Sequence, residues 1–187
     1  MRDKMALTLA ETSVLIGSAL RNHDVRAMRK INNRCIDETA LRFQQPTYNY
    51  ALITYVLAKV LSKPRYFKQG RGKELISTVD RLLRTCEGLA KTAEYESLAL
   101  AQGKILSSME KMDDEDRRYV KGILQKAKLK IASTLYAQGI SLGNASEVAG
   151  ADKRELLLYA GQTMMFDRLH EKKTMEQRMK ELREIFS

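Results

Sequence analysis

Proline occurs at only two positions in this 187-residue chain, Pro46 and Pro64, and both lie in its first third or just beyond it. Proline interrupts helices because it lacks a backbone N–H and its ring clashes with the preceding turn. The rest of the sequence is rich in leucine, alanine, lysine, arginine and glutamate, which have high helix propensity. With 44% hydrophobic residues, the chain can also bury a sizeable core. The sequence therefore predicts an all-α protein.

Apolar residues recur at helical spacing along most of the chain, which predicts a series of amphipathic helices. The expected core positions of the first two helices include Leu7, Leu9, Val14, Leu15, Ala19, Leu20, Met28, Ile31, Cys35, Ile36, Ala40 and Leu41. We expect helices over about 4–20, 24–43, 47–62, 74–111, 114–137, 142–149, from 153 onward, and near the carboxyl end. The span 74–111 contains Gly88 and Gly103, so it is either one long helix or two.

Residues that favour helix ends mark several of these boundaries. Asp24 and Thr47 are expected N-caps. Residues 44–46 are expected to break the preceding helix before Thr47 begins the next one. The acidic run 112–116 is expected to begin the helix over 114–137, because carboxylates favour the positive amino end of a helix. Gly139 is expected to end that helix, because glycine readily adopts the left-handed conformation.

The chain carries 33 basic and 23 acidic residues, a net charge of +10, which favours association with polyanions. In the second expected helix, basic side chains recur at spacings of three and four, which places them on one stripe. This stripe consists of Arg26, Arg29, Lys30 and Arg34. It is either a surface that follows a phosphate backbone or an ordinary solvated helix face.

A second basic segment follows Ser62 and mixes cations with two aromatic residues, Tyr66 and Phe67. Its cations are Lys63, Arg65, Lys68, Arg71 and Lys73. Basic residues interleaved with aromatic rings suit phosphate contact combined with base stacking, as in proteins that bind RNA or single strands. The alternative is an exposed loop whose two rings pack into the core.

The stretch Ser141 to Thr163, SLGNASEVAGADKRELLLYAGQT, has the spacing of a helix-turn-helix. Ser141 is a cap candidate, Gly150 can form the tight turn, and a second helix can begin near Lys153. The inward-facing positions of such a motif would be Ala145, Ala149, Ala151, Leu156 and Tyr159. Ser146 stands where DNA-binding versions more often have alanine. We therefore expect a helical bundle over residues 1–111, followed by a helix-turn-helix region over 112–187 that ends in an amphipathic helix.

This stretch resembles the SLGKAAELAGVS-type helix-turn-helix of small prokaryotic, often archaeal, regulators and predicted antitoxins. The resemblance covers about residues 141–163 and implies sequence-specific DNA binding in transcription regulation, usually by a dimer. At the matching positions, Lys153 and Arg154 would reach the major groove, and Ser141 and Asn144 would contact phosphates.

Three consecutive leucines, Leu156 to Leu158, depart from this pattern, because base edges are read by hydrogen bonds. Leu157 and Leu158 are expected to pack against the carboxyl-terminal helix, another subunit or a protein partner. The residues expected to bind such a partner are Leu157, Leu158, Met175, Met179, Leu182 and Phe186. A protein-interaction or antitoxin-like adaptor is therefore the alternative function, and RNA or ribosome association through residues 63–73 is a third.

The sequence contains no phosphate-binding loop, nucleophile elbow or dinucleotide fingerprint, and its two histidines lie apart from both cysteines. We therefore expect a non-enzymatic protein without metal or cofactor. Cys35 and Cys86 are expected to be buried hydrophobes, which agrees with a cytoplasmic location. The most apolar stretch, Tyr48 to Leu61, is shorter than the roughly 20 residues that span a bilayer. We expect no membrane association, and we expect the nucleic-acid partner to be DNA in preference to RNA.

Overall fold

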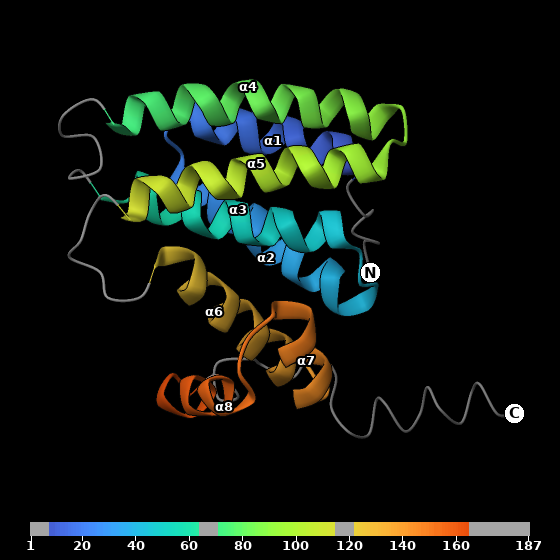
Figure 1. Ribbon diagram of the computed structural model, residues 1–187, viewed down its shortest axis with the longest axis vertical. Coiled ribbons are helices and arrows are strands. Elements are labelled where there is room, and N and C mark those ends of the chain that lie inside the picture. Colours follow the sequence, from blue (N-terminus) through green and yellow to red (C-terminus); the bar gives the residue numbers. More distant parts are fainter. Residues whose placement is uncertain (1–7, 64–70, 115–121, 165–187) are drawn as a thin grey trace, which may run out of the picture.

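A computed structural model describes residues 8–63, 71–114 and 122–164. Within these ranges the protein forms eight α-helices and no strand, which confirms the predicted all-α fold (Figure 1). The helices are α1 (Leu9–Arg21), α2 (Val25–Leu41), α3 (Gln45–Leu61), α4 (Arg71–Lys91), α5 (Tyr95–Asp114), α6 (Ile123–Ala137), α7 (Leu142–Ala149) and α8 (Lys153–Gln162).

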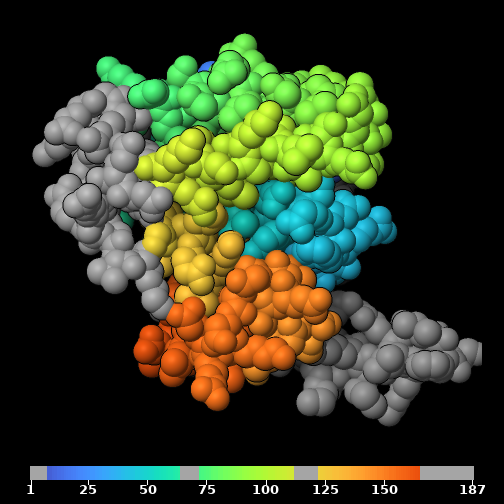
Figure 2. All heavy atoms as spheres, in the orientation of Figure 1, coloured from blue at the N-terminus to red at the C-terminus, as the bar shows by residue number. Residues whose placement is uncertain are grey.

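The first five helices pack as a bundle around α3. Helix α4 packs against α1 and α5, and α3 packs against α2 and α5. Helix α6 leaves this bundle across α3, and α7 and α8 pack mainly on α6 (Figure 1). The end of the molecule opposite α4 is therefore formed by α7 and α8 (Figure 2).

Helix α3 is buried along almost its entire length, including Tyr50, Ile53, Leu57 and Val60. This agrees with the apolar character of the segment and with its central position in the bundle. None of the helices in the described ranges has both the length and the apolar composition needed to cross a membrane.

Four of the described helices end in the same type of turn. In this turn a residue with positive φ is followed by a residue whose N–H donates a hydrogen bond to the carbonyl five residues earlier. The positive-φ residues are His23, Ala93, Gly139 and Gly150. The corresponding N···O distances are 2.9 Å (Asp24 to Ala19), 3.0 Å (Glu94 to Leu89), 3.1 Å (Ile140 to Leu135) and 3.0 Å (Ala151 to Ser146). This geometry satisfies carbonyls that a helix end leaves unpaired. The expected end at Gly139 is confirmed.

The expected helix over 74–111 is two helices, and neither glycine makes the break. Gly88 lies within α4 and Gly103 within α5. The chain turns at Ala93, whose φ is 58°. Alanine rarely adopts this conformation, so the position of the turn could not be recognised from its residue type.

The expected N-cap at Asp24 is confirmed, because its carboxylate accepts a hydrogen bond from the Ala27 N–H at 2.9 Å. The expected cap at Thr47 is wrong. Helix α3 begins at Gln45 and takes Pro46 into its first turn, where a missing N–H costs nothing. Its N-cap residue, Gln44, makes no side-chain capping bond.

The prediction that residues 112–116 begin a helix is also wrong where the structure describes them. Residues 112–114 are the last residues of α5, whose buried positions Ile105 and Met109 extend its packed face. Helix α6 begins at Ile123, after Gly122. Residues 115–121, including part of the acidic run, lie outside the described residues.

Three positions predicted to lie in the core are exposed. Val14 and Leu15 lie on the outer side of α1, and Leu41, at the end of α2, is 88% exposed. Ala19 and Leu20 are buried as predicted, and the other buried residues of α1 are Ile16, Gly17 and the small polar residues Thr12 and Ser13. These small polar residues allow close packing, so apolarity alone did not identify the buried face. Leu7 lies outside the described residues.

Candidate nucleic-acid interface

Helices α7 and α8 have the boundaries expected from the sequence, and Gly150 lies between them with φ 56° and ψ 42°. Four of the five residues expected to face inward are buried, namely Ala145, Ala149, Ala151 and Leu156, and the fifth, Tyr159, is half-buried. The small alanines allow the two short helices to approach each other and α6 closely. The predicted pattern of buried residues is confirmed.

Ser146, the departure from the expected alanine, is buried and has a defined partner. Its hydroxyl donates a hydrogen bond to the Ala151 carbonyl oxygen at 2.7 Å. The Ala151 N–H in turn donates to the Ser146 carbonyl oxygen at 3.0 Å. Ser146 therefore joins the two sides of the turn twice, and its hydroxyl is buried without loss of hydrogen bonding.

The start of α8 is fixed by Asp152. Its Oδ1 accepts hydrogen bonds from the backbone N–H groups of Arg154 and Glu155, at 2.8 and 3.1 Å. These N–H groups form the site that a phosphate would otherwise occupy at a helix amino end. Because Asp152 occupies them, any anion bound here must be held by side chains.

The outer face of α8 combines cations with apolar groups. Lys153 and Arg154 are exposed, and neither forms an ion pair with another residue that the structure describes. Leu157 and Leu158 are 46% and 64% exposed, so none of the described helices covers them. The reason is geometric, because Leu156 and Ala160 already supply the side of α8 that faces inward.

The two residues expected to contact phosphates lie at the start of α7. Ser141 caps the helix, as predicted, because its hydroxyl oxygen accepts a hydrogen bond from the Asn144 N–H at 3.2 Å. The Asn144 side chain is exposed. A further bond ties this region to the bundle, since Gln138 Nε2 donates to Asp37 Oδ1 on α2 at 2.8 Å.

The inner side of α8 packs mainly on α6, and Tyr159 on this side lies near Tyr55 of α3. Burial, and to a lesser extent the nearby Tyr159, raises the pKa of Tyr55 on α3 to about 12. The Tyr55 hydroxyl therefore remains neutral at neutral pH. The outer side of α8 is left as the exposed surface.

The basic residues of α2 do not form one uniform stripe. Arg26, Arg29 and Lys30 are exposed, but Arg34 is half-buried, with its Nε 3.7 Å from Glu38 Oε1. Lys30 and Arg34 line a groove of about 310 Å³ between α1 and α2. Arg26 and Arg29 do not line it. The three exposed cations remain available for phosphate contact on a different element from α8.

Residues 64–70 of the second basic segment, including Arg65 and Lys68, lie outside the described residues. Lys63 is half-buried and has an interaction partner. Arg71 begins α4, and Lys73 is exposed on it. The expected partner-binding residues of the carboxyl end also lie outside the described ranges, namely Met175, Met179, Leu182 and Phe186.

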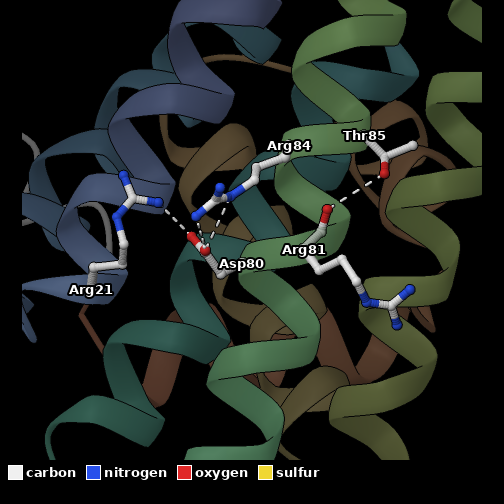
Figure 3. A network of polar contacts seen from close by, with 5 residues as sticks. All are labelled: Arg21, Asp80, Arg81, Arg84 and Thr85. Atoms are coloured by element: carbon white, nitrogen blue, oxygen red, sulfur yellow. Dashed lines mark hydrogen bonds and ion pairs between the residues drawn. The ribbon is translucent and has the colours of Figure 1, made fainter.

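An ionic cluster that the sequence did not indicate joins α1 to α4. Asp80 bonds Arg21 from α1 and Arg84 from its own helix, the latter at 3.0 Å (Figure 3). A Cβ on Gly17 would lie 3.2 Å from Arg21 Nη1, so the glycine gives the arginine room. The cluster lines a groove of about 410 Å³. Only the i,i+4 pair of Asp80 and Arg84 was visible in the sequence.

The buried thiols do not form a reactive site. Burial raises the pKa of Cys35 to about 12 and that of Cys86 to about 11, so both are uncharged at neutral pH. Tyr50 forms a buried hydrogen bond with Ser13, and Asn49 donates to Gln102 at 3.1 Å. Within the ranges that the structure describes, no group of three or more potential metal ligands occurs.

No protein-family model matches the chain, and no curated protein or solved structure matches it significantly.

Proposed function

We propose that this protein binds duplex DNA and that α8 is the helix that enters the major groove. The observation that carries the proposal is the exposed first turn of α8, next to the turn closed by Gly150. Its cations, Lys153 and Arg154, have no ion-pair partner among the described residues. A short helix packed beneath a second, exposed helix is the arrangement used by helix-turn-helix proteins. Such a protein would act as a regulator of transcription.

The side chains of this face match different parts of a duplex. Arginine and lysine can donate to guanine O6 and N7, and apolar side chains can contact the methyl group of thymine. Arg154 and Lys153 would serve the first role, and Leu157 and Leu158 the second. Ser141 and Asn144, at the amino end of α7, would position the protein on phosphates, which fixes orientation without reading sequence.

The net charge of +10 supports the same proposal, because sequence-independent attraction accounts for much of DNA affinity. Arg26, Arg29 and Lys30 on α2 would add to this attraction. Binding should therefore weaken steeply with salt. The proposed mode uses side chains alone, without a cofactor, and the proposed location is the cytoplasm.

The test compares two charge reversals of equal size. Lys153→Glu with Arg154→Glu removes the cations of α8, and Lys104→Glu with Lys111→Glu makes the same net change on exposed positions of α5. Binding to a fluorescent duplex pool of random sequence is measured by anisotropy over a series of salt concentrations. We expect the α8 variant to lose binding at moderate salt and the α5 variant to retain most of it.

If both variants weaken binding equally, bulk charge rather than α8 is responsible and the proposal is wrong. If neither variant changes it, α8 does not contact DNA. Each phosphate that a variant no longer neutralises should reduce the slope of log affinity against log salt by about 0.9.

The second candidate is a protein-interaction or antitoxin-like adaptor, and it is favoured by the exposure of Leu157 and Leu158. An exposed pair of leucines on one helix face is typical of a helix that docks on a partner. This alternative predicts that the wild-type chain binds the duplex pool through its bulk charge alone, so that the α8 and α5 variants weaken this binding equally. RNA binding through residues 63–73 stays a prediction from the sequence.

A further inference from the structure

A groove of about 310 Å³ runs between α1 and α2. Apolar residues from both helices line it, namely Leu15 and Ala19 from α1 and Ala27 and Ile31 from α2. Leu15 is 40% exposed, so an apolar side chain is open to solvent inside the groove. An apolar groove between two helices can hold the apolar face of a third helix.

The two sides of this groove differ in charge. The residues that α1 contributes are all uncharged. The edge formed by α2 carries a row of cations at spacings of four, namely Arg26, Lys30 and Arg34. Lys30 and Arg34 line the groove, and Arg26 lies one turn before Lys30 on the same stripe. No acidic residue occurs between positions 25 and 36, so the edge is positive.

Two carboxylates near this edge are engaged as helix caps. Asp24, at one end of the groove, accepts a hydrogen bond from the Ala27 N–H at 2.9 Å. Glu11 of α1, on which Arg34 acts electrostatically, accepts hydrogen bonds from the Thr8 N–H and hydroxyl at 2.8 and 2.9 Å. Neither carboxylate forms an ion pair with another residue that the structure describes.

The row of cations is neutralised at only one of its ends. The Nε of Arg34 lies 3.7 Å from the Oε1 of Glu38. Arg26 and Lys30 are exposed, and within the described ranges neither forms an ion pair. The same holds for Arg29, next to Lys30. Three cations therefore face solvent against one capping carboxylate at the end of the groove, and the surplus charge lies beside the apolar lining.

We propose that this groove binds an acidic amphipathic helix of a partner protein. Apolar side chains of that helix contact Leu15 and Ile31. Carboxylates four residues apart face Arg26 and Lys30, which have the same spacing. A nucleic acid would pair its phosphates with the cations and leave the apolar lining uncovered, so the lining favours a helix. The proposal does not depend on the function assigned to α8.

Binding in this groove should be reversible and should weaken with salt. Exposed ion pairs contribute little affinity, and complementary charge mainly raises the association rate and selects the partner. The apolar contacts inside the groove supply the rest of the affinity. In the proposed function the cations of α2 also attract DNA, so a bound acidic helix should weaken DNA binding; this consequence alone rests on the proposed function.

The test is fluorescence anisotropy of the full chain with a fluorescein-labelled synthetic peptide of about 18 residues, a length at which a helix can form. The peptide carries leucines on one face, at spacings of three and four, and glutamates on both sides of that face. A second peptide has alanine in place of every leucine and the same charge. We expect the leucine peptide to bind with a dissociation constant of about 100 μM or lower. The alanine peptide should bind at least about tenfold more weakly, because it lacks the apolar contacts.

One pair of variants tests the charged edge. Arg26→Glu with Lys30→Glu should weaken binding of the leucine peptide about tenfold, because two exposed ion pairs become repulsive. Lys104→Glu with Lys111→Glu makes the same net change on exposed positions of α5 and should retain most of the binding.

A second pair tests the apolar lining. Leu15→Ala should weaken binding of the leucine peptide about fivefold, because the groove loses apolar contact area. Leu100→Ala makes the same change at an exposed position of α5 and should leave the affinity unchanged. All of these substitutions are at exposed positions, and circular dichroism checks that each variant is folded.

Equal binding of the two peptides, equal losses in the α2 and α5 charge variants, or an unchanged affinity in Leu15→Ala would each overturn the inference. If the leucine peptide does not bind while duplex binding depends on Arg26 and Lys30, these cations serve DNA and the inference is wrong. If peptide binding depends on the groove while duplex binding ignores Lys153 and Arg154, the inference stands and the proposed function is wrong.

Discussion

The bundle α1–α5 and the pair α7–α8 bury their residues in different ways. Among the described residues, the large fully buried side chains come mostly from the bundle and from α6, and the pair α7–α8 contributes one of them, Leu156. The short pair is otherwise packed through alanines such as Ala145, Ala149 and Ala160. The other two leucines of α8, Leu157 and Leu158, are exposed. Stability is therefore concentrated in the bundle, and the residues proposed to read DNA lie on α8.

The largest expected change in stability comes from removing a buried side chain of the bundle, which leaves a cavity. Leu57→Ala should lower the free energy of unfolding by about 2–5 kcal/mol, because Leu57 is fully buried and packed structure around a new cavity relaxes only in part. Leu100→Ala makes the same change at an exposed position of α5 and should alter that free energy by less than about 0.5 kcal/mol. Urea denaturation followed by circular dichroism measures both. Equal effects would contradict the placement of the core.

Smaller changes in the free energy of unfolding are expected from substitutions in the turn between α7 and α8 and in the turn between α4 and α5. Gly150→Ala forces alanine into a left-handed conformation and should lower the free energy of unfolding by about 1–2 kcal/mol. Ala93→Gly makes the reverse change in the bundle's own turn and should raise it, by less, because glycine also increases the freedom of the unfolded chain. Thermal denaturation measures the direction of the stability change in both variants. A stabilising Gly150→Ala would show that the turn between α7 and α8 differs from the one described.

These turns also show how far the fold could be predicted from the sequence. The scarcity of proline and the helical spacing of apolar residues predicted the all-α class, and Gly139 and Gly150 predicted two helix ends. His23 and Ala93 make the same turn without glycine. The N-cap residue Asp24 predicted the break at His23, but no residue type predicted the turn at Ala93. Their conformation depends on the helices that pack on either side, which no single segment encodes.

The candidate site was predictable to a similar degree. Spacing placed Ser141, the inward alanines and the start of α8 correctly, because these depend on local geometry. The exposure of Leu157 and Leu158 could not be predicted, since it depends on which face of α8 meets α6. The Arg21–Asp80 pair could not be predicted either, because it joins helices far apart in the sequence.

One local signal in the sequence was overlooked, namely the threonine and glutamate of a capping box at Thr8 and Glu11. This capping box provides the smallest predicted effect, at the edge of the bundle. The Glu11 carboxylate accepts hydrogen bonds from the Thr8 N–H and hydroxyl, at 2.8 and 2.9 Å. The backbone bond, followed by the hydroxyl bond, lowers the pKa of Glu11 below its ordinary value. A carboxyl group with a lowered folded-state pKa stabilises the fold above its unfolded-state pKa, and this stabilisation is lost as the pH falls through the folded-state pKa.

Glu11→Gln should therefore be slightly less stable than wild type at neutral pH and equal to it in strong acid. Paired thermal denaturation curves over a series of pH values measure the difference. A gap between the two proteins that stays constant at all pH values would show that the Glu11 charge has no part in the cap.

The most direct test of the proposed function is hydrogen exchange of the full chain with and without a saturating concentration of the duplex pool. If α8 is the DNA-binding helix, slowed exchange should be confined to the amino end of α7 and to α8, from Asp152 to Leu158. Exchange in α4 and α5 should be unchanged. Protection centred on α2 or on residues 63–73, with α8 unaffected, would contradict the claim that the outer face of α8 is the surface that binds DNA.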